Sequence, residues 1–482
     1  MKQIPHFINN KSTESIDGKT FDSINPSTQK IWAKASLGSK SDTEKAVKAA
    51  RDAFDNGPWP KMTAKERSVF LHKIADLIEK NIDELAEIET TDMGKPITQS
   101  RGKDIPRTVD NFRFFADYIT LTEDESFPMS NNFHIYTRYE PVGVVAAISP
   151  WNFPIMLASW KIAPALAFGN TVVLKPAEQT PVSCYRLAEI AAEAGIPEGV
   201  LNVIHGFGPG SAGEYLTTNP DVDLVTFTGE SNTARAIQKA VAPTLKGVSF
   251  ELGGKGANIV FDDADIKKAA DMAVASKFRN NGQVCISPNR FYIHENKKEE
   301  FVNLFVEKTK KLKIGNGMEP DVQLGPITTK KRLNEIEELV ETTKKEGGKI
   351  LLGGKRPSGF NKGYFFEPTI FDDVKDHFTI MKIEPFGPLV PMLSFKTFDE
   401  VVERANKHEL GLASYICTNS MEKAHKASEL METGTVAVNT PVVAIAEAPF
   451  GGIKQAGYGR EGGSMAIKDY LNVKYTHLGI KG

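Results

Sequence analysis

Cysteine is scarce in this 482-residue chain, which has only Cys184, Cys285 and Cys417. The three form no CxxC metal-binding pattern and give no basis for a disulfide framework. Such sparse use of cysteine fits a reducing compartment, so we expect a cytoplasmic protein. A free cysteine is most often a small buried hydrophobic residue, so a chemical role for any of them needs further support.

Net charge and long apolar runs are also lacking. The 59 Lys and Arg residues nearly balance 61 Asp and Glu residues, for a formal net charge of −2. This balance creates no strong field for nucleic acid or an anionic membrane, so we expect neither as a partner. The longest apolar stretch, residues 142–148, is too short to span a bilayer, and residues 1–10 lack the apolar core of a signal peptide. The nine histidines form no His-x-x-x-His pattern, so we expect no metal site.

The chain is too long for a single hydrophobic core, so two or more domains are expected. Short apolar segments alternate with helical patterns in two successive series, which predicts two α/β domains with parallel sheets between helices. The expected strands are 143–148, 170–175, 201–204, 224–227, 257–260, 291–294, 350–352, 390–395 and 413–416. The expected helices are 42–56, 64–93, 154–168, 181–194, 210–218, 231–242, 264–278, 297–313, 329–345, 398–406 and 421–432.

Cys285 and Glu251 carry the strongest chemical signal. Cys285 lies in Phe278–Arg290 after two asparagines and a glycine, which is unusual company for a structural cysteine. Glu251 lies in Phe250–Lys255, between apolar residues and ahead of two glycines. A thiol and a carboxylate in glycine-bearing segments can supply a nucleophile and a base beside a closely bound ligand. Partial burial would raise the pKa of this carboxylate, which suits a base near neutral pH.

These two segments resemble the aldehyde dehydrogenase superfamily, and the resemblance runs from about Phe7 to the C-terminus. It includes Ile148–Pro154, with the sequence Ile-Ser-Pro-Trp-Asn-Phe-Pro, and Ala448–Ile453. The resemblance implies a Rossmann-like NAD-binding domain and a second, catalytic α/β domain. The implied NAD-binding domain comprises residues 1–122 and 142–252, and the implied catalytic domain comprises residues 253–452.

The resemblance also implies a small sheet that pairs subunits, formed by residues 123–141 and 465–482. Phe133–Arg138 alternates polar and apolar residues, which is typical of a hairpin within 121–141. An isolated hairpin is marginal without a partner, so we expect a homodimer or a homotetramer.

The implied chemistry begins when Cys285 attacks an aldehyde and forms a thiohemiacetal, which loses a hydride and becomes a thioester. Asn152 and the backbone N–H of Cys285 would bind the oxyanion, and Glu251 would activate the water that releases the acid. Glu461 matches a further family glutamate near the acyl group, with a part in proton handling. Lys161 matches an interior lysine near the same region. The alternative for Lys161 is a helix lysine that extends its ammonium group to solvent.

The adenosine end of the coenzyme is indicated by Lys175 and Glu178. They follow an expected strand at its carboxyl end, where parallel sheets bind dinucleotides. In the family both residues hold the ribose hydroxyl groups. A carboxylate there accepts hydrogen bonds from a free 2′-hydroxyl and repels a 2′-phosphate, so NAD is favoured over NADP.

The turn Thr226–Arg235 resembles the family's pyrophosphate-binding strand, turn and helix. Ala234 replaces the usual second glycine, and Glu230 stands where many members have serine. We expect Glu230 to point into solvent, because a carboxylate would repel a pyrophosphate, while Ser231 and backbone N–H groups face the ligand. In all, the resemblance assigns these residues to the coenzyme: Ile148, Trp151, Lys175, Glu178, Gly208, Phe227, Thr228, Gly229, Ser231, Leu252, Gly253, Glu384 and Phe386.

The aldehyde is only weakly indicated. The segment around Arg107 is similar to muconic-semialdehyde dehydrogenases, in which arginines at the positions of Arg107 and Arg460 bind substrate carboxylates. The alternatives are an ordinary surface pair for Arg107 and a structural role for Arg460. Phe450 is expected beside the substrate tunnel. Lys277–Asn280 also resembles succinic-semialdehyde dehydrogenases, and betaine-type and aliphatic aldehydes stay open.

Two rival functions fit the same fold. In a CoA-acylating dehydrogenase, CoA takes the acyl group in place of water, and Glu251 argues against it because such an enzyme needs no water-activating base. A non-catalytic structural or binding protein on this fold would be expected to have lost its site residues. Cys285, Glu251 and Asn152 are all present.

Overall fold

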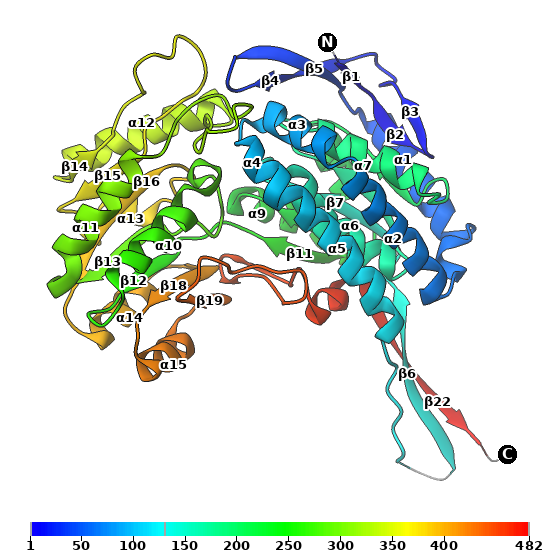
Figure 1. The fold of residues 1–482 in the computed structure, drawn as a ribbon. Coiled ribbons are helices and arrows are strands. Elements are labelled where there is room, and N and C mark those ends of the chain that lie inside the picture. Colours follow the sequence, from blue (N-terminus) through cyan, green and yellow to red (C-terminus); the bar gives the residue numbers. More distant parts are fainter. Residues whose placement is uncertain (1, 130–131, 481–482) are drawn as a thin grey trace.

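The computed structural model describes residues 2–129 and 132–480 and consists of two α/β halves and a projecting arm (Figure 1). One half is built on an eight-stranded sheet and the other on a seven-stranded sheet. Both sheets are mostly parallel and lie between helices, so the predicted α/β class is confirmed. Within the described ranges, no helix is both long enough and apolar enough to cross a membrane.

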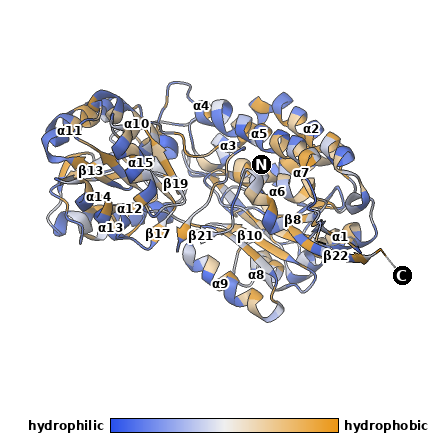
Figure 2. Ribbon diagram, turned by 90° about the horizontal axis from the view of Figure 1, so that it is seen from below, coloured by the Kyte–Doolittle hydropathy of each residue, from blue (hydrophilic) through white to orange (hydrophobic). Residues whose placement is uncertain are grey.

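The eight-stranded sheet has antiparallel pairs only at its two ends. In spatial order its strands are β21 (Gly457–Tyr458), β11 (Gly247–Glu251), β10 (Leu224–Thr228), β7 (Val144–Ile148), β8 (Thr171–Lys175), β9 (Leu201–Val203), β2 (His6–Ile8) and β3 (Lys11–Thr13). Every residue of β7, β8 and β10 is buried, as expected for parallel strands that helices cover on both faces. Figure 2 shows these strands as a hydrophobic layer among helices of mixed hydropathy.

Two groups of helices cover the faces of this sheet, and each group forms its own buried cluster with the strands. One face carries α2 (Ala64–Lys80), α3 (Ile82–Met93), α5 (Ile105–Tyr118), α6 (Pro154–Ala167) and α7 (Val182–Glu193). The other face carries α1 (Lys40–Asp55), α8 (Ala212–Thr218) and α9 (Ser231–Val241). The single helix expected over 64–93 is two helices that meet at Asn81.

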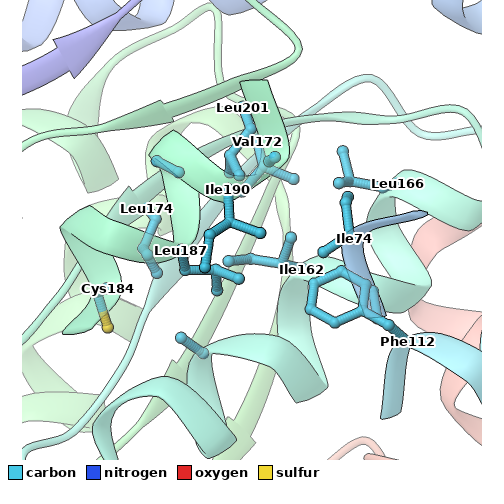
Figure 3. Packing of buried hydrophobic residues seen from close by; sticks show 14 of the residues in the cluster. Ile74, Phe112, Ile162, Leu166, Val172, Leu174, Cys184, Leu187, Ile190 and Leu201 are labelled. Atoms are coloured by element: carbon cyan, nitrogen blue, oxygen red, sulfur yellow. The ribbon is translucent and has the colours of Figure 1, made fainter. Parts of the chain in front are cut away.

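Figure 3 shows the first of these interfaces at close range. Ile74 of α2, Phe112 of α5 and Ile162 of α6 belong to one buried cluster with Val172 of β8. Burial of each such side chain contributes about 1.5–3 kcal/mol. Cys184 of α7 lies in the same cluster with no exposed surface, so this cysteine is structural.

The seven-stranded sheet is parallel except for its edge strand β14. Its strands in spatial order are β14 (Lys349–Leu352), β15 (Thr369–Asp372), β16 (Leu389–Phe395), β13 (Arg290–His294), β12 (Ala257–Val260), β18 (Ala413–Cys417) and β19 (Thr435–Val438). One face packs on α10 (Ile266–Phe278) and α11 (Glu295–Lys310). The other face packs on α12 (Lys330–Lys345), α13 (Thr379–Lys382), α14 (Phe398–Asn406) and α15 (Met421–Leu430).

The projecting arm joins two distant parts of the chain. β6 (Phe133–Pro141) pairs antiparallel along its whole length with β22 (Leu471–Gly479), and the pair extends away from both halves (Figure 1). The expected hairpin within 121–141 is present but short: Phe127 donates to the carbonyl oxygen of Ile135 and Thr137 donates to that of Glu125, both at 2.9 Å, and Ser126 bridges to Tyr136. Alternating polarity at 133–138 did not reveal the longer pairing with β22, because alternation does not show which strand pairs with which.

The remaining elements connect the halves. The N-terminal strands β1 (Lys2–Ile4), β4 (Thr20–Asn25) and β5 (Lys30–Ser36) form a separate three-stranded sheet. After β19 the chain returns from the seven-stranded sheet to the eight-stranded one, where β21 pairs with β11. On the way, β20 (Ile453–Lys454) pairs with β17 (Leu410–Gly411). This return segment, which had no predicted elements, carries Phe450 and Glu461 to the end of β11.

Candidate active site

Several predicted site residues end parallel strands at one edge of the eight-stranded sheet. β7 ends at Ile148, β8 at Lys175, β10 at Thr228 and β11 at Glu251. The strand register sets Ile148 opposite Lys175, and Thr228 opposite Glu251. This carboxyl edge is where parallel α/β sheets bind ligands.

Cys285 follows α10 through a tight turn of left-handed residues. Asn280, Asn281 and Gly282 have φ angles of 47°, 56° and 74°, which asparagine and glycine tolerate better than other residues. A Cβ at Gly282 would clash with the carbonyl oxygen of Gly387, so glycine is required there. The turn leaves Cys285 half-buried, whereas the other two cysteines are buried.

Asn152 lies against the loop that carries Cys285. The side-chain Nδ2 of Asn152 donates to the main-chain oxygen of Gln283 at 3.1 Å. The main-chain oxygen of Asn152 accepts from Nδ2 of Asn280 at 3.0 Å. The side chain is almost fully buried, at 3% exposure. These two bonds hold the expected oxyanion donor and the expected nucleophile in a fixed relation, which the sequence predicted only through the family resemblance.

Cys285 packs at the border of a small apolar cluster that includes Phe153, Trp160 and Phe450. The rings of Trp160 and Phe450 stack with centroids 5.2 Å apart. Burial raises the pKa of the Cys285 thiol well above its usual range, and nearby carboxyl groups raise it further. The resting group is therefore the thiol, and it has to lose a proton before it can attack a carbonyl carbon.

The Glu251 carboxyl group is buried without a protein partner. Neither of its oxygens accepts a hydrogen bond from residues 2–129 or 132–480. Gly451 lies directly against it, since a Cβ there would come within 2.6 Å of Oε1. Burial raises the pKa of Glu251 well above its usual range, and Glu461 raises it further. A buried carboxyl group that the protein leaves unpaired suits proton exchange with a water or a substrate.

Lys161 forms a buried ion pair with Glu461. Its ammonium group contacts Oε1 of Glu461 and also donates to Oγ1 of Thr226 at 3.2 Å. The Lys161 side chain has no exposed surface, so the alternative of a lysine that reaches solvent is wrong. Glu461 is fixed by backbone bonds to Phe450 in both directions, at 2.7 and 2.8 Å. The pair therefore lies next to Glu251, whose pKa it influences.

In the predicted adenosine subsite, the buried ammonium group of Lys175 already uses two of its hydrogen-bond donors within the protein. Lys175 donates to the carbonyl oxygens of Pro176 and Gly206 at 2.7 and 2.8 Å, and its Nζ lies 3.9 Å from Oε2 of Glu178. Gly208 follows in a loop where a Cβ would meet open space. The Glu178 side chain is 32% exposed, so its carboxylate can reach a ligand at this edge.

Glu384 and Phe386, which the resemblance assigns to the part of the coenzyme that carries the nicotinamide and its ribose, also lie where hydrogen-bonding capacity is unfilled. Glu384 packs on the backbone of Gly253, where a Cβ would clash with its carboxyl group. Its Oε1 is buried, and no described residue donates to it. Burial raises the pKa of Glu384 to about 7. Phe386 has a φ of 43°, and its ring packs edge to face against the Trp151 ring, with the two centroids 5.3 Å apart. These groups fit a ligand that offers ribose hydroxyl groups and a flat ring.

The predicted pyrophosphate turn lies between β10 and α9. Thr228 Oγ1 is buried and has no hydrogen-bond partner in the part of the chain that the structure describes. Gly229 donates its N–H to the carbonyl oxygen of Glu251 at 3.0 Å, and Ser231 begins α9. Glu230 is exposed as expected, but it is not free, because Arg332 of α12 donates to it at 3.1 Å. The other three residues assigned to the coenzyme, Ile148, Phe227 and Leu252, are buried in the core behind this edge.

Comparison with known proteins decides the family. A sequence profile of the aldehyde dehydrogenase family matches residues 13–476. The chain belongs to the aldehyde dehydrogenase family. It is therefore an oxidoreductase that acts on aldehydes. Aldehyde dehydrogenase 1A1 of Gallus gallus is 43% identical over 476 residues, which cover 98% of this chain and 93% of that protein.

Solved structures agree with this fold. The NAD⁺ complex of an aldehyde dehydrogenase from Bacillus cereus is 42% identical in sequence. The two structures superpose with a TM-score of 0.98, and the match covers 100% of this chain and 97% of that one. An NADP-dependent enzyme of Escherichia coli is 37% identical in sequence. Its structure superposes with a TM-score of 0.97, and the match covers 99% of this chain and 98% of that one. Relatives of this aldehyde dehydrogenase thus include both coenzyme types.

The two predicted substrate arginines have different surroundings in this aldehyde dehydrogenase. Arg460 donates through Nη1 to the carbonyl oxygens of Gly452 and Gly459, at 3.0 and 2.6 Å. The guanidinium carbon of Arg107 lies 4.8 Å from the centroid of the Trp160 ring, and Nε of Arg107 donates to Oδ1 of Asn111. The Nη2 atom of Arg107 is buried and has no hydrogen-bond partner among the described residues. Burial lowers the pKa of Arg107 to about 10, so the side chain is still charged at neutral pH.

Arg279 is a site residue that sequence reasoning missed. Its guanidinium group lies over the Phe153 ring at 4.7 Å, on the same apolar cluster that Cys285 borders. Nη2 donates to Oδ1 of Asp104 at 2.9 Å, while Nε is buried with no partner within the described ranges. Its place in the Cys285 motif was the only available signal. Among the described residues of this aldehyde dehydrogenase, no three His, Cys, Asp or Glu side chains gather as a metal site.

Proposed function

We propose that this aldehyde dehydrogenase oxidises an aldehyde to a carboxylic acid with NAD, through a thioester on Cys285. The observation that carries the proposal is the unpaired, buried Glu251 carboxyl group beside the Cys285 loop and Asn152. The adjoining edge of the sheet supports a dinucleotide, because Thr228 and Glu384 leave buried oxygens there without described protein partners. When NAD is bound, its nicotinamide accepts the hydride that the substrate carbon loses.

The first half of the reaction uses Cys285 and Asn152. The thiol passes its proton to solvent water, and the sulfur attacks the carbonyl carbon to give a thiohemiacetal. Its oxyanion accepts hydrogen bonds from Asn152 Nδ2 and from the backbone N–H of Cys285. Loss of one preset donor of this kind costs about 2.7–4 kcal/mol of transition-state stabilisation. Loss of the hydride from the same carbon leaves the thioester.

The second half uses Glu251. Its carboxylate takes a proton from a water molecule, and the water oxygen attacks the thioester carbon. The carbon–sulfur bond then breaks, the acid leaves, and protonated Glu251 returns its proton to the Cys285 sulfur. A raised pKa makes Glu251 a stronger base than an exposed carboxylate, and the Lys161–Glu461 pair lies close enough to influence its charge.

A trapping experiment tests this mechanism. The full-length protein with the substitution Glu251→Gln is mixed with NAD and propanal, and the acid-quenched protein is measured by mass spectrometry. We expect one propanoyl group on the Cys285 peptide and one NADH per site. NADH formation without a Cys285 adduct would contradict the mechanism. Addition of CoA provides a further arm, in which acyl-CoA formed in place of acid would favour the CoA-acylating alternative.

For the coenzyme we propose a preference for NAD over NADP. Glu178 supports it, since a carboxylate at the adenosine ribose accepts hydrogen bonds from a 2′-hydroxyl and repels a 2′-phosphate. The NAD⁺ complex of the Bacillus cereus relative is consistent with this, although the Escherichia coli relative is NADP-dependent. Equal kcat/KM values for the two coenzymes would overturn the argument from Glu178.

For the substrate we propose an aldehyde that carries a carboxylate at its far end. Arg107 and Arg279 support it, because both guanidinium groups lie on rings of the apolar cluster that Cys285 borders. Each leaves a buried nitrogen without a described partner, and an arginine fork matches a carboxylate. Arg460 stays a prediction as a second carboxylate ligand, and its bonds to backbone carbonyls favour the structural alternative.

The substrate proposal is tested with butanal and 4-oxobutanoate, which differ in a terminal carboxylate. We expect Arg107→Gln and Arg279→Gln to lower kcat/KM for 4-oxobutanoate about 10–100-fold, as a lost charge-assisted hydrogen bond does, with a smaller effect on butanal. Arg113→Gln is the matched control, since Arg113 lies on the same helix as Arg107 and pairs with exposed carboxylates. Equal losses for both aldehydes would show that the arginines do not select a carboxylate.

The domain division, the assembly and the location follow as parts of this proposal. We propose residues 1–122 and 142–252 as the NAD-binding domain and 253–452 as the catalytic domain. Segments 123–141 and 465–482 would pair subunits in a homodimer or homotetramer. The exposed apolar side chains of the β6–β22 arm support such a contact, and they include Tyr139, Val473, Tyr475 and Leu478. The three free cysteines support a cytoplasmic location.

A further inference from the structure

Glu230 and Arg332 connect the two halves of the molecule across the proposed coenzyme groove. Glu230 is the N-cap residue of α9, on the eight-stranded sheet, but its side chain makes no capping bond. Instead its Oε1 accepts from Nη2 of Arg332, in the first turn of α12 on the seven-stranded sheet. The other nitrogen of the Arg332 fork, Nη1, lies 3.0 Å from Glu335 of its own helix.

The pair lies beside Glu384 and Thr228, whose buried oxygens lack hydrogen-bond partners among the described residues. Arg332 lies 5.8 Å from the centroid of the Phe386 ring and close enough to Glu384 to stabilise its charged form. At the other end, Glu230 follows Thr228, whose buried Oγ1 has no partner in the described structure. The pair therefore spans the interval between the proposed pyrophosphate and nicotinamide-ribose subsites.

A carboxylate at this position is unfavourable for an anionic ligand. The N-terminus of a helix attracts anions through its free N–H groups and its partial positive charge. The Glu230 side chain is 68% exposed, so its carboxylate lies on the solvent side of this turn, where its negative charge still weakens the attraction of the helix N-terminus for an anion. Arg332 supplies the opposite charge from the facing half, and the side chains of Arg332 and Glu230 are 20% and 68% exposed, so solvent and salt screen the pair in part.

We propose that Glu230 and Arg332 are a charge-matched pair that sets the affinity of this chain for its dinucleotide. Arg332 neutralises the Glu230 carboxylate beside the N-terminus of α9, so that the anionic pyrophosphate can bind there. Arg332 is therefore a positioning residue whose importance depends on Glu230. The inference rests on the proposed function only in taking the groove as the NAD site.

A double-mutant cycle on the full-length protein tests this inference, with NAD binding measured by titration calorimetry in the absence of aldehyde. Arg332→Gln leaves Glu230 unneutralised, so we expect the Kd for NAD to rise about tenfold at low salt. Glu230→Gln removes the repulsion, so we expect the Kd to fall or stay equal. The double variant should return to within about threefold of the wild type, and the Arg332→Gln defect should shrink in 0.5 M salt, where charges are screened.

The controls separate this inference from the proposed function. Lys344→Gln removes the same positive charge from α12, but Lys344 pairs with Glu341 rather than Glu230, so its Kd should match that of the wild type. A double variant as weak as Arg332→Gln would overturn the inference, because Arg332 would then act on NAD directly. An unchanged Kd in Arg332→Gln would overturn it as well. A wild-type chain that does not bind NAD at all would contradict the proposed function itself.

Discussion

Two buried groups of charges in this molecule differ in how completely they are paired. The first, which we call the paired cluster, consists of Lys95, Asp104 and Arg279. Oδ2 of Asp104 accepts from Lys95 at 2.6 Å, and Oδ1 accepts from Arg279 at 2.9 Å. Lys95 and Asp104 have no exposed surface, and both oxygens of the carboxylate are used. The paired cluster thus fixes α5 and the start of the Cys285 loop to one another.

The second group, which we call the reactive cluster, consists of Glu251, Lys161 and Glu461. Lys161 pairs with one carboxyl oxygen of Glu461, but the other oxygen and both oxygens of Glu251 lack hydrogen-bond partners in the described part of the chain. The carboxyl groups of both clusters are buried, so burial does not distinguish them. The difference is that the protein fills both oxygens of Asp104, which favours stability, and leaves oxygens of Glu251 and Glu461 to be filled by water or substrate.

Removal of the nucleophile beside the reactive cluster gives the largest expected effect. Cys285→Ala should lower NADH formation by about 10⁴-fold or more, because no covalent intermediate can form. The free energy of unfolding in urea should change by less than about 1.5 kcal/mol, since Cys285 is half-buried and its replacement removes a single sulfur atom. Turnover near that of the wild type would place the nucleophile elsewhere.

Glu251→Gln tests the unpaired carboxyl group itself. The amide cannot take a proton from water, so steady-state turnover should fall about 10²–10⁴-fold. Formation of the thioester does not need this base, so rapid-mixing absorbance should still record a burst of one NADH per site. A variant without a burst, or with normal turnover, would move the base to Glu461.

Asp104→Asn tests whether the paired cluster serves stability instead. The change leaves the buried Lys95 ammonium without its carboxylate, which costs about 3–5 kcal/mol in comparable buried pairs. Urea unfolding should report this loss, while the folded fraction should keep its turnover of butanal. Asp110→Asn, at an exposed position of the same helix, is the matched control. Equal stability of the two variants would remove the distinction between the clusters.

The pH dependence of deacylation gives a smaller effect with a defined sign. Because burial raises the pKa of Glu251, most of this group is protonated at pH values below its raised pKa and inactive as a base. Below that pKa the deacylation rate should therefore rise about tenfold per pH unit. Single-turnover decay of the acyl-enzyme measures this rate, and in Glu251→Gln the rising limb should be absent. A rate that falls as the pH rises would contradict the assignment.

Much of the fold could be predicted from the sequence, because short-range patterns determine it. The fully apolar segments at β7, β8 and β10, separated by helical patterns, indicated a parallel sheet and the edge where it binds ligands. The hairpin within 121–141 is present but short, and β11, β15 and α5 were not predicted. Pairing of β6 with β22 depends on contacts between opposite ends of the chain, which alternation does not encode.

The residues of the candidate site also fall into those that the sequence indicated and those that only long-range contacts reveal. The motif around Cys285 and the glycine-rich segment after Glu251 indicated the nucleophile and the base without any structure. Arg279 stood inside the same motif, but its role depends on Asp104, which is 175 residues away in the chain. The partner of Glu230 was missed because Arg332 is 102 residues away, on the other half of the molecule.

By itself, the amino-acid sequence determined the α/β class and the family and indicated the candidate reactive groups, because these depend on local periodicity and on short motifs. Only the tertiary structure decided which buried charges are paired and which are left for a ligand. The physical reason is that the pKa and the role of a carboxyl group depend on its distance from other charges and from water. Chain folding sets those distances between residues that are far apart in the sequence.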